Sequence, residues 1–164
     1  MLSNAPGFLP GTKQERLRIQ QIGGRSLDVN VLSTIPIISV TLNQNYGGRQ
    51  IHAFSKFLRP CIIAFSLRRS IMAVMGADSA FDLFYGKKYF ELKKEGKDEE
   101  AELLRSNYIK EFNEKSRAEN DAYKTQVLDF MIDDVSELRE AMIKSYSLAV
   151  EKNKILKQII TNNL

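Results

Sequence analysis

The sequence predicts a mainly α-helical protein with an extended, irregular N-terminal arm that holds at most a short β segment. Three observations favour this fold class. The chain from Gly96 to Leu164 contains no further Gly or Pro, the strongest breakers of regular structure. Residues 51–76 are apolar with a helical period. Only residues 27–42 are rich in β-branched residues, and a single strand or short hairpin does not make a stable sheet.

The first fifty residues are expected to form an extended basic arm. Prolines and glycines punctuate residues 1–12, and a short helix over residues 13–22 would end at the following Gly pair. Alternating Leu and Val, followed by Ile and Val beyond Pro36, predict extended chain in residues 27–42. This segment pairs either within the chain or with a partner, and residues 43–48 close it as a loop.

Residues 51–95 are expected to form an apolar and aromatic helical region. At 100° per residue, the His, Lys and Ser side chains of residues 51–76 and two of the three Arg gather on one narrow face, opposite a wide apolar face. The pattern is imperfect, because Arg68 falls on the apolar side and Ile62 and Ile63 fall on the polar side. Arginines interrupt the apolar run, which disfavours a simple transmembrane helix. We expect this amphipathic helix to lie on a membrane surface or among partner subunits, or to be the core helix of a small domain. An aromatic-rich helix follows over residues 80–95.

Residues 96–164 are expected to form a long, charged, coiled-coil-like helical hairpin. One helix would cover residues 99–121, and the other, over residues 122–160, places acids early and lysines late, in agreement with the helix dipole. Its packing stripe would consist of Leu128, Met131, Val135, Leu138, Met142, Ala149, Leu156 and Ile159.

The charge of the chain is unevenly distributed. Residues 1–77 carry nine basic and two acidic residues, a formal charge of +7, whereas residues 78–164 carry fifteen basic and eighteen acidic residues, −3. A basic half indicates a polyanionic neighbour, either nucleic acid, anionic lipid or an acidic protein surface. The candidate contacts with a partner or anionic surface are Arg16, Arg18, Arg25, Arg49, Lys56, Arg59, Arg68 and Arg69.

Composition also limits the chemistry. His52 is the single His and Cys61 the single Cys, which disfavours a His-based zinc site, a Ser/His/Asp triad and an internal disulfide. On one helix these two side chains would point apart, so a Cys–His pair is not expected. No catalytic residue, cofactor or metal ion is predicted, and the chain is not expected to be an enzyme.

An apolar, basic first half followed by long charged helices resembles, in layout, the peripheral-stalk and accessory subunits of organellar membrane complexes. The resemblance implies a non-catalytic structural subunit whose partners are other protein subunits and possibly anionic lipid. It also implies association with the mitochondrial inner membrane, without a cleaved presequence.

Two other interpretations remain open. The first is a nucleic-acid-associated ribosomal or virion component that uses the Arg-rich half, which would place the chain in the cytoplasm or a virion. The second is a small enzyme without His or Cys chemistry, whose carboxylates would need shifted pKa values inside a pocket.

Overall fold

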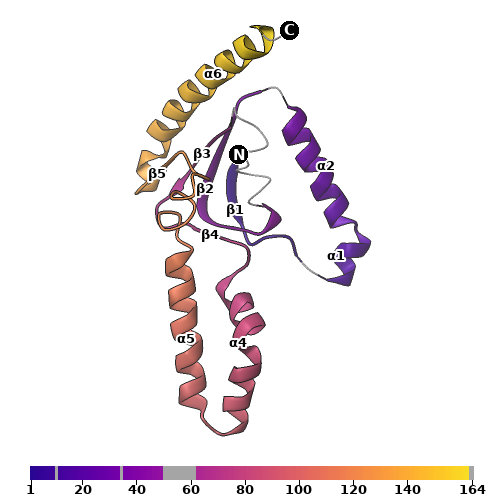
Figure 1. The fold of residues 1–164 in the computed structure, drawn as a ribbon, viewed down its shortest axis with the longest axis vertical. Helices are drawn as coiled ribbons and strands as arrows, with labels where there is room; N and C mark the ends of the chain where they lie inside the picture. The colour runs from indigo at the N-terminus through magenta and orange to yellow at the C-terminus, as the bar shows by residue number, and fades with distance from the viewer. Residues whose placement is uncertain (10, 34, 50–61, 163–164) are drawn as a thin grey trace.

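The computed structural model describes residues 1–9, 11–33, 35–49 and 62–162. Its centre is a five-stranded β-sheet flanked by helices (Figure 1). The predicted mainly α-helical class is therefore wrong, and the fold is α/β. The strands are β1 (Leu2–Ala5), β2 (Ile37–Tyr46), β3 (Ile62–Leu67), β4 (Ile71–Ala73) and β5 (Phe130–Ile132).

The longest strand, β2, organises the sheet. It pairs in parallel with β1 on one side and with β3 and then β4 on the other. The first half of β2 pairs with β3, with Val40 opposite Phe65, and its last residues pair with β4, with Tyr46 opposite Ala73. Strand β5 continues the sheet beyond β3, again in parallel. The named strands therefore all run in one direction, and their carboxyl ends face the same edge.

The apolar stretch at residues 51–76 is not one amphipathic helix. Its described part forms β3 and β4, joined by a turn at residues 68–70, while residues 51–61 lie outside the described residues. Every residue of β3 is buried. A parallel strand covered on both faces consists of successive apolar residues. A short apolar run of this kind fits a buried helix equally well, so periodicity alone does not identify the strand.

The two faces of the sheet carry separate apolar clusters. On one face, Val40, Phe65 and Leu67 pack with Ala141 of the last helix. The ring of Phe65 stacks on that of Phe130, with centroids 4.8 Å apart. The other face packs against the segment between residues 118 and 128, chiefly through Ala118, Ala122 and Leu128. Both clusters extend to β5, whose Met131 and Ile132 lie on opposite faces.

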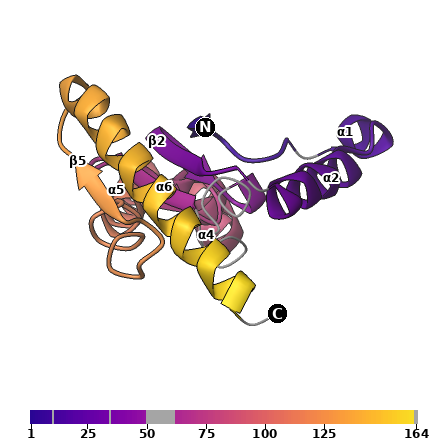
Figure 2. The same cartoon turned by 90° about the horizontal axis from the view of Figure 1, so that it is seen from above.

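The helices differ in how they contact the sheet. The last helix lies across β2 and β3 (Figure 2), whereas the helices between residues 77 and 115 form a hairpin that projects away from the sheet (Figure 1). The first two helices lie to one side. None of the helices in the described part of the chain is long and apolar enough to cross a membrane. The helices are α1 (Thr12–Arg16), α2 (Ile19–Leu32), α4 (Ala77–Lys94), α5 (Asp98–Lys115), the 3-10 turn η1 (Val135–Glu137) and α6 (Leu138–Asn162).

Several element boundaries differ from the sequence-based expectations. The arm expected over residues 1–50 contains β1, α1, α2 and β2, and α2 runs through Gly23 and Gly24, which were expected to end a helix. The predicted hairpin of α5 with a helix at residues 122–160 is wrong, because α5 packs on α4 and the last helix begins only at Leu138. A capping box between Asp134 and Glu137 sets this late start.

Candidate functional site

The carboxyl ends of three parallel strands bring three short segments together. Ala5 at the end of β1 pairs with Asn45 near the end of β2, and Tyr46 pairs with Ala73 at the end of β4. The N–H of Gly47 donates a hydrogen bond of 2.9 Å to the carbonyl of Ala73. Ligands of open parallel sheets bind outside the carboxyl ends of the strands. We call the residues gathered here, Gly7, Phe8, Tyr46, Gly47, Gly48, Arg49 and Gly76, the carboxyl-edge cluster.

Two glycines of the cluster have backbones that other residues rarely adopt. Gly47 has φ +61°, and a Cβ added to it would lie 3.2 Å from the carbonyl oxygen of Val74. Gly7 has φ +96°, and its Cβ would lie 3.5 Å from the carbonyl oxygen of Tyr46. Glycine adopts such angles without steric cost. Glycine at both positions therefore lets these segments pack closely together at the edge of the sheet.

Phe8 links the cluster to α2. A Cβ on Gly23 of α2 would lie 3.2 Å from the Phe8 ring, and a Cβ on Gly48 would lie 3.4 Å from it. The ring therefore needs glycine on both sides to fit between them. It remains 43% exposed, so one part of the aromatic surface is available to a ligand or a partner.

Tyr46 places a phenol beside the start of α4. A Cβ on Gly76, the residue before α4, would lie 3.8 Å from the Tyr46 ring. Burial, and secondarily the negative charge of Asp78, raise the pKa of the Tyr46 phenol above its ordinary value of 10.0. The hydroxyl therefore stays protonated at neutral pH and can donate a hydrogen bond.

The cluster supplies hydrogen-bond donors and positive charge. Gly48 and Arg49 have entered a helical conformation, and the first N–H groups of a helical turn have no partner within it. The described cluster residues include no Ser, Cys, His, Asp or Glu. Such an arrangement can stabilise negative charge on a ligand oxygen, which is electrostatic rather than nucleophilic catalysis.

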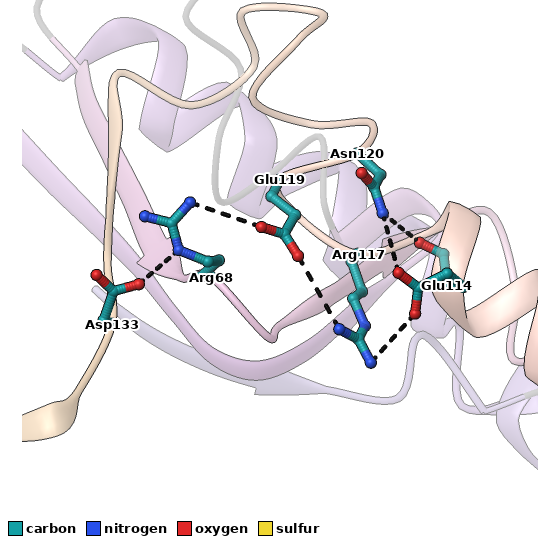
Figure 3. Close-up of polar contacts among 6 residues, drawn as sticks. All are labelled: Arg68, Glu114, Arg117, Glu119, Asn120 and Asp133. Carbon is teal, nitrogen blue, oxygen red and sulfur yellow. Dashed lines mark hydrogen bonds and ion pairs between the residues drawn. The ribbon is translucent and has the colours of Figure 1, made fainter.

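Arg68, a candidate contact with an anionic surface, forms part of a network of ion pairs within the chain (Figure 3). Its guanidinium donates to Asp133 and lies 3.6 Å from Glu119. Glu119 lies 4.0 Å from Arg117. Arg117 in turn lies 3.2 Å from Glu114, whose carbonyl accepts a 2.8 Å hydrogen bond from the Asn120 amide. The network joins the β3–β4 turn to the end of α5, to residues 117–120 and to the residue after β5.

The other candidate contacts in the described part of the chain are divided among several elements. Arg16 ends α1, Arg18 directly precedes α2, and Arg25 lies within α2. Arg69 lies exposed in the β3–β4 turn, and Arg49 is the one that joins the carboxyl-edge cluster. Lys56, Arg59, His52 and Cys61 lie outside the described residues.

The expected packing stripe is divided among several elements. Leu128 precedes β5, Met131 lies in β5, Val135 lies in η1, and Leu138, Met142, Ala149, Leu156 and Ile159 lie in α6. Within α6, Ala149 is fully buried, and Leu138 and Met142 pack against the core, whereas Ile159 is exposed.

The glycines of the carboxyl-edge cluster were not among the predicted site residues. Residues 43–48 were interpreted as a closing loop and residues 1–12 as irregular chain. The available signal was the Gly pair directly after a β-rich run, because a ligand-binding turn commonly follows a strand in this way.

Comparison with known protein families identifies the fold. The carboxyl transferase domain model matches residues 1–162. The chain belongs to the carboxyl transferase domain family. The long-chain acyl-coenzyme A carboxylase beta4 subunit of Mycobacterium tuberculosis, a biotin-dependent protein, is 33% identical over 110 residues, 67% of this chain and 20% of that protein. The propionyl-CoA carboxylase beta chain of Saccharopolyspora erythraea is 34% identical over 113 residues, 69% of this chain and 20% of that protein.

Solved structures agree with the family assignment. The transcarboxylase 12S hexamer structure with methylmalonyl-coenzyme A and methylmalonic acid matches with a TM-score of 0.71 and 26% identity, over 92% of this chain and 27% of that one. The P. aeruginosa geranyl-CoA carboxylase beta subunit shares the fold, with a TM-score of 0.71 at 20% identity over 92% of this chain and 28% of that one. The chain spans about one fifth of the length of the two curated relatives.

The family assignment corrects the predicted function. The prediction of a non-catalytic scaffold is wrong, as is the prediction that the chain is not an enzyme, because the family consists of carboxyl transferases. The comparisons do not support the interpretation as a coiled-coil structural subunit of a mitochondrial membrane complex. They also do not support the interpretation as a nucleic-acid-associated component. The expectation of protein-subunit partners holds in its general form, since the relatives are named as beta subunits and chains, whereas lipid and nucleic acid have no support as partners.

Proposed function

We propose that this chain forms part of a biotin-dependent carboxyl transferase that acts on an acyl-coenzyme A thioester. The carboxyl-edge cluster is the observation that carries the proposal. It joins bare main chain, helix-start N–H groups and a protonated phenol at the place where parallel sheets bind ligands. The names of the family relatives supply the substrate class and the cofactor.

The cluster fits a flat cofactor ring such as that of biotin. A Cβ at Gly47 would lie 3.2 Å from the Val74 carbonyl, so only glycine lets the turn after β2 pack this closely against the segment after β4. Gly47, Gly48 and Tyr46 would hold the ring. Biotin, when bound, supplies the activated carboxyl group.

The residues of the chain itself would bind and stabilise charge. The N–H groups of Gly48 and Arg49 can donate to a ligand carbonyl oxygen as negative charge develops on it. In other enzymes, removal of one such donor lowers kcat by about a hundredfold to a thousandfold. The Tyr46 hydroxyl, held protonated, provides a further donor. The Phe8 ring beside Gly48 excludes water from one side, which strengthens these interactions.

The chain would work together with other polypeptides. Helix α2 exposes an apolar face that nothing in the described residues covers. Val29 and Leu32 on this face are 67% and 79% exposed. Apolar patches of this kind mark protein–protein contacts.

The test is a transfer assay on the protein isolated with its natural partners. Labelled methylmalonyl-coenzyme A is mixed with free biotin, and the appearance of label on biotin is measured. We expect transfer, and expect Gly47→Val to abolish it, because a side chain would occupy the cluster and force the backbone out of its φ of +61°. Gly86→Ala in α4 is the matched control, since a Cβ there meets nothing within 4 Å. Absence of transfer, together with absence of binding of either compound by the folded protein, would overturn the proposal.

A further inference from the structure

A row of three hydroxyls crosses one face of the sheet. Ser3 of β1 pairs in register with Thr41 of β2, and Thr41 pairs with Ser66 of β3. Side chains of register partners on adjacent strands lie on the same face of a sheet. Met131 of β5 continues the row beyond Ser66 and packs against the apolar cluster that includes residues 118–128. The hydroxyl row therefore lies on the face of the sheet that this segment covers.

The three side chains are removed from water without a hydrogen-bond partner in the described part of the chain. Thr41 and Ser66 are fully buried, and Ser3 is 3% exposed. The hydroxyl oxygens of all three lack a partner. By contrast, the Ser70 hydroxyl, which is equally buried, donates to the Thr41 carbonyl at 3.1 Å. A buried hydroxyl without a partner destabilises a folded protein, and three in one row would offset a large part of the usual stability of a domain.

The spacing of the row suits a small bridging molecule. Adjacent strands lie about 4.8 Å apart, which is too far for a direct O–H···O hydrogen bond. A water molecule between two hydroxyls makes two hydrogen bonds of about 2.8 Å each and so spans this separation. Ser and Thr hydroxyls both donate and accept, which matches a neutral ligand such as water. An ion would need an opposite charge beside it, and the three side chains of the row carry none.

We propose that Ser3, Thr41 and Ser66 form an internal hydration site, with one water molecule bridging each adjacent pair of hydroxyls. Buried waters of this kind make about three hydrogen bonds to groups that would otherwise have no partner. The site also specifies the register of the strands, because a slip of β2 by one residue would bring Val40 into the row in place of Thr41. This inference goes beyond the proposed function and requires neither biotin nor a coenzyme A thioester.

A crystal structure of the whole chain that shows ordered water tests the site directly. We expect one water molecule between Ser3 and Thr41 and another between Thr41 and Ser66, each within hydrogen-bond distance of both hydroxyls. Thr41→Val removes the shared hydroxyl and should remove both waters. Absence of these waters from the wild type, direct bonds between the hydroxyls, or a Thr41→Val structure that keeps the waters would overturn the proposal.

Urea unfolding provides a second test, in which the two alternatives differ in sign. With water in the row, Thr41→Val and Ser66→Ala each lose hydrogen bonds, and each should raise the unfolding equilibrium constant by about twofold to tenfold. The double variant should raise it by less than the product of the two single effects, because both variants lose the same bridging water. Hydroxyls without a partner would instead give variants more stable than the wild type, which would overturn the proposal.

Ser145→Ala in α6 is the matched control. Ser145 is fully buried and its hydroxyl also has no partner in the described part of the chain. Its neighbours one helical turn away on the same face of α6 are Ala141 and Ala149, so no second hydroxyl stands beside it there. Ser145→Ala should therefore not raise the unfolding equilibrium constant. A rise equal to that of Thr41→Val would show that the row has no special effect, and would overturn the proposal.

Discussion

Asp129 and Ala64 exchange two hydrogen bonds between the segment before β5 and the neighbouring strand β3. The Ala64 N–H donates to the Asp129 carboxylate at 2.8 Å, and the Asp129 N–H donates to the Ala64 carbonyl at 2.7 Å. Ala64 is fully buried, so its N–H has no access to water. The Asp129 carboxylate therefore takes the place of a backbone carbonyl as the acceptor for Ala64, one residue before β5 begins.

We expect Asp129→Ala to lower the free energy of unfolding by about 1–3 kcal/mol, the cost of a buried donor left without an acceptor. Asp129→Asn should cost less, because the amide oxygen can still accept from Ala64. Urea unfolding followed by circular dichroism measures both. The control is Lys152→Met, which removes only a 3.5 Å ion pair to Asp129 from a side chain that is 40% exposed, and should cost less than about 1 kcal/mol. Equal losses in Asp129→Ala and Lys152→Met would contradict this account.

The Arg68–Asp133 pair should make stability depend on pH in the acid range. The hydrogen bond from Arg68, and secondarily its positive charge, lower the pKa of Asp133 below its ordinary value of 3.8. Because the folded value is the lower one, this contribution is present above pH 3.8 and is lost as the pH falls through the folded value. Asp133→Asn should therefore flatten the decline in the urea midpoint below pH 4. An NMR titration in which Arg68→Gln leaves the pKa of Asp133 unchanged would contradict the assignment.

Gly47 should tolerate no side chain. Gly47→Ala places a Cβ at φ +61° and 3.2 Å from the Val74 carbonyl, which we expect to lower the free energy of unfolding by about 1–2 kcal/mol. Gly86→Ala should instead stabilise the protein by about 0.5–1 kcal/mol, because Gly86 lies inside α4 and its Cβ would meet nothing. Thermal denaturation compares the two variants, and a Gly47→Ala protein as stable as Gly86→Ala would refute the expectation.

The α4–α5 hairpin should unfold apart from the sheet when its aromatic centre is removed. Phe81 is 1% exposed and contacts the rings of Tyr89 and Tyr108, each with a centroid distance of 5.7 Å. We expect Phe81→Ala to cost about 3–5 kcal/mol, enough to open the hairpin. Hydrogen exchange should then accelerate in residues 77–115 and stay slow in β2 and β3. Phe84→Ala on the same helix, where the ring is 68% exposed, should change little.

Sequence patterns predicted the projecting helices better than the sheet. The helix expected at residues 80–95 corresponds to α4, because its boundaries are set locally by Gly76 and Gly96. The strands needed contacts distant in sequence. Residues 62–67 are apolar on both faces, and only their pairing with β2 and β5 distinguishes them from a helix.

The candidate site was hidden for a related physical reason. Its members at Gly7, Gly47, Gly48 and Gly76 contribute main chain and close packing, and a search for reactive side chains passes over both. Arg49 was noticed, but only as one of eight scattered bases. The parallel register that brings the ends of β1, β2 and β4 together depends on pairings distant in sequence, which no local pattern shows.

Strand β2, which leads directly into Gly47 and Gly48, hydrogen-bonds to three other strands and is also in contact with α6. Regions with many such contacts open last when a protein unfolds in parts. The turn at Gly47 and Gly48 is thus anchored to the element expected to open last, so transient fraying of α1, α2 or the α4–α5 hairpin would leave its geometry intact. Local opening of those outer helices therefore need not disturb the turn at Gly47 and Gly48.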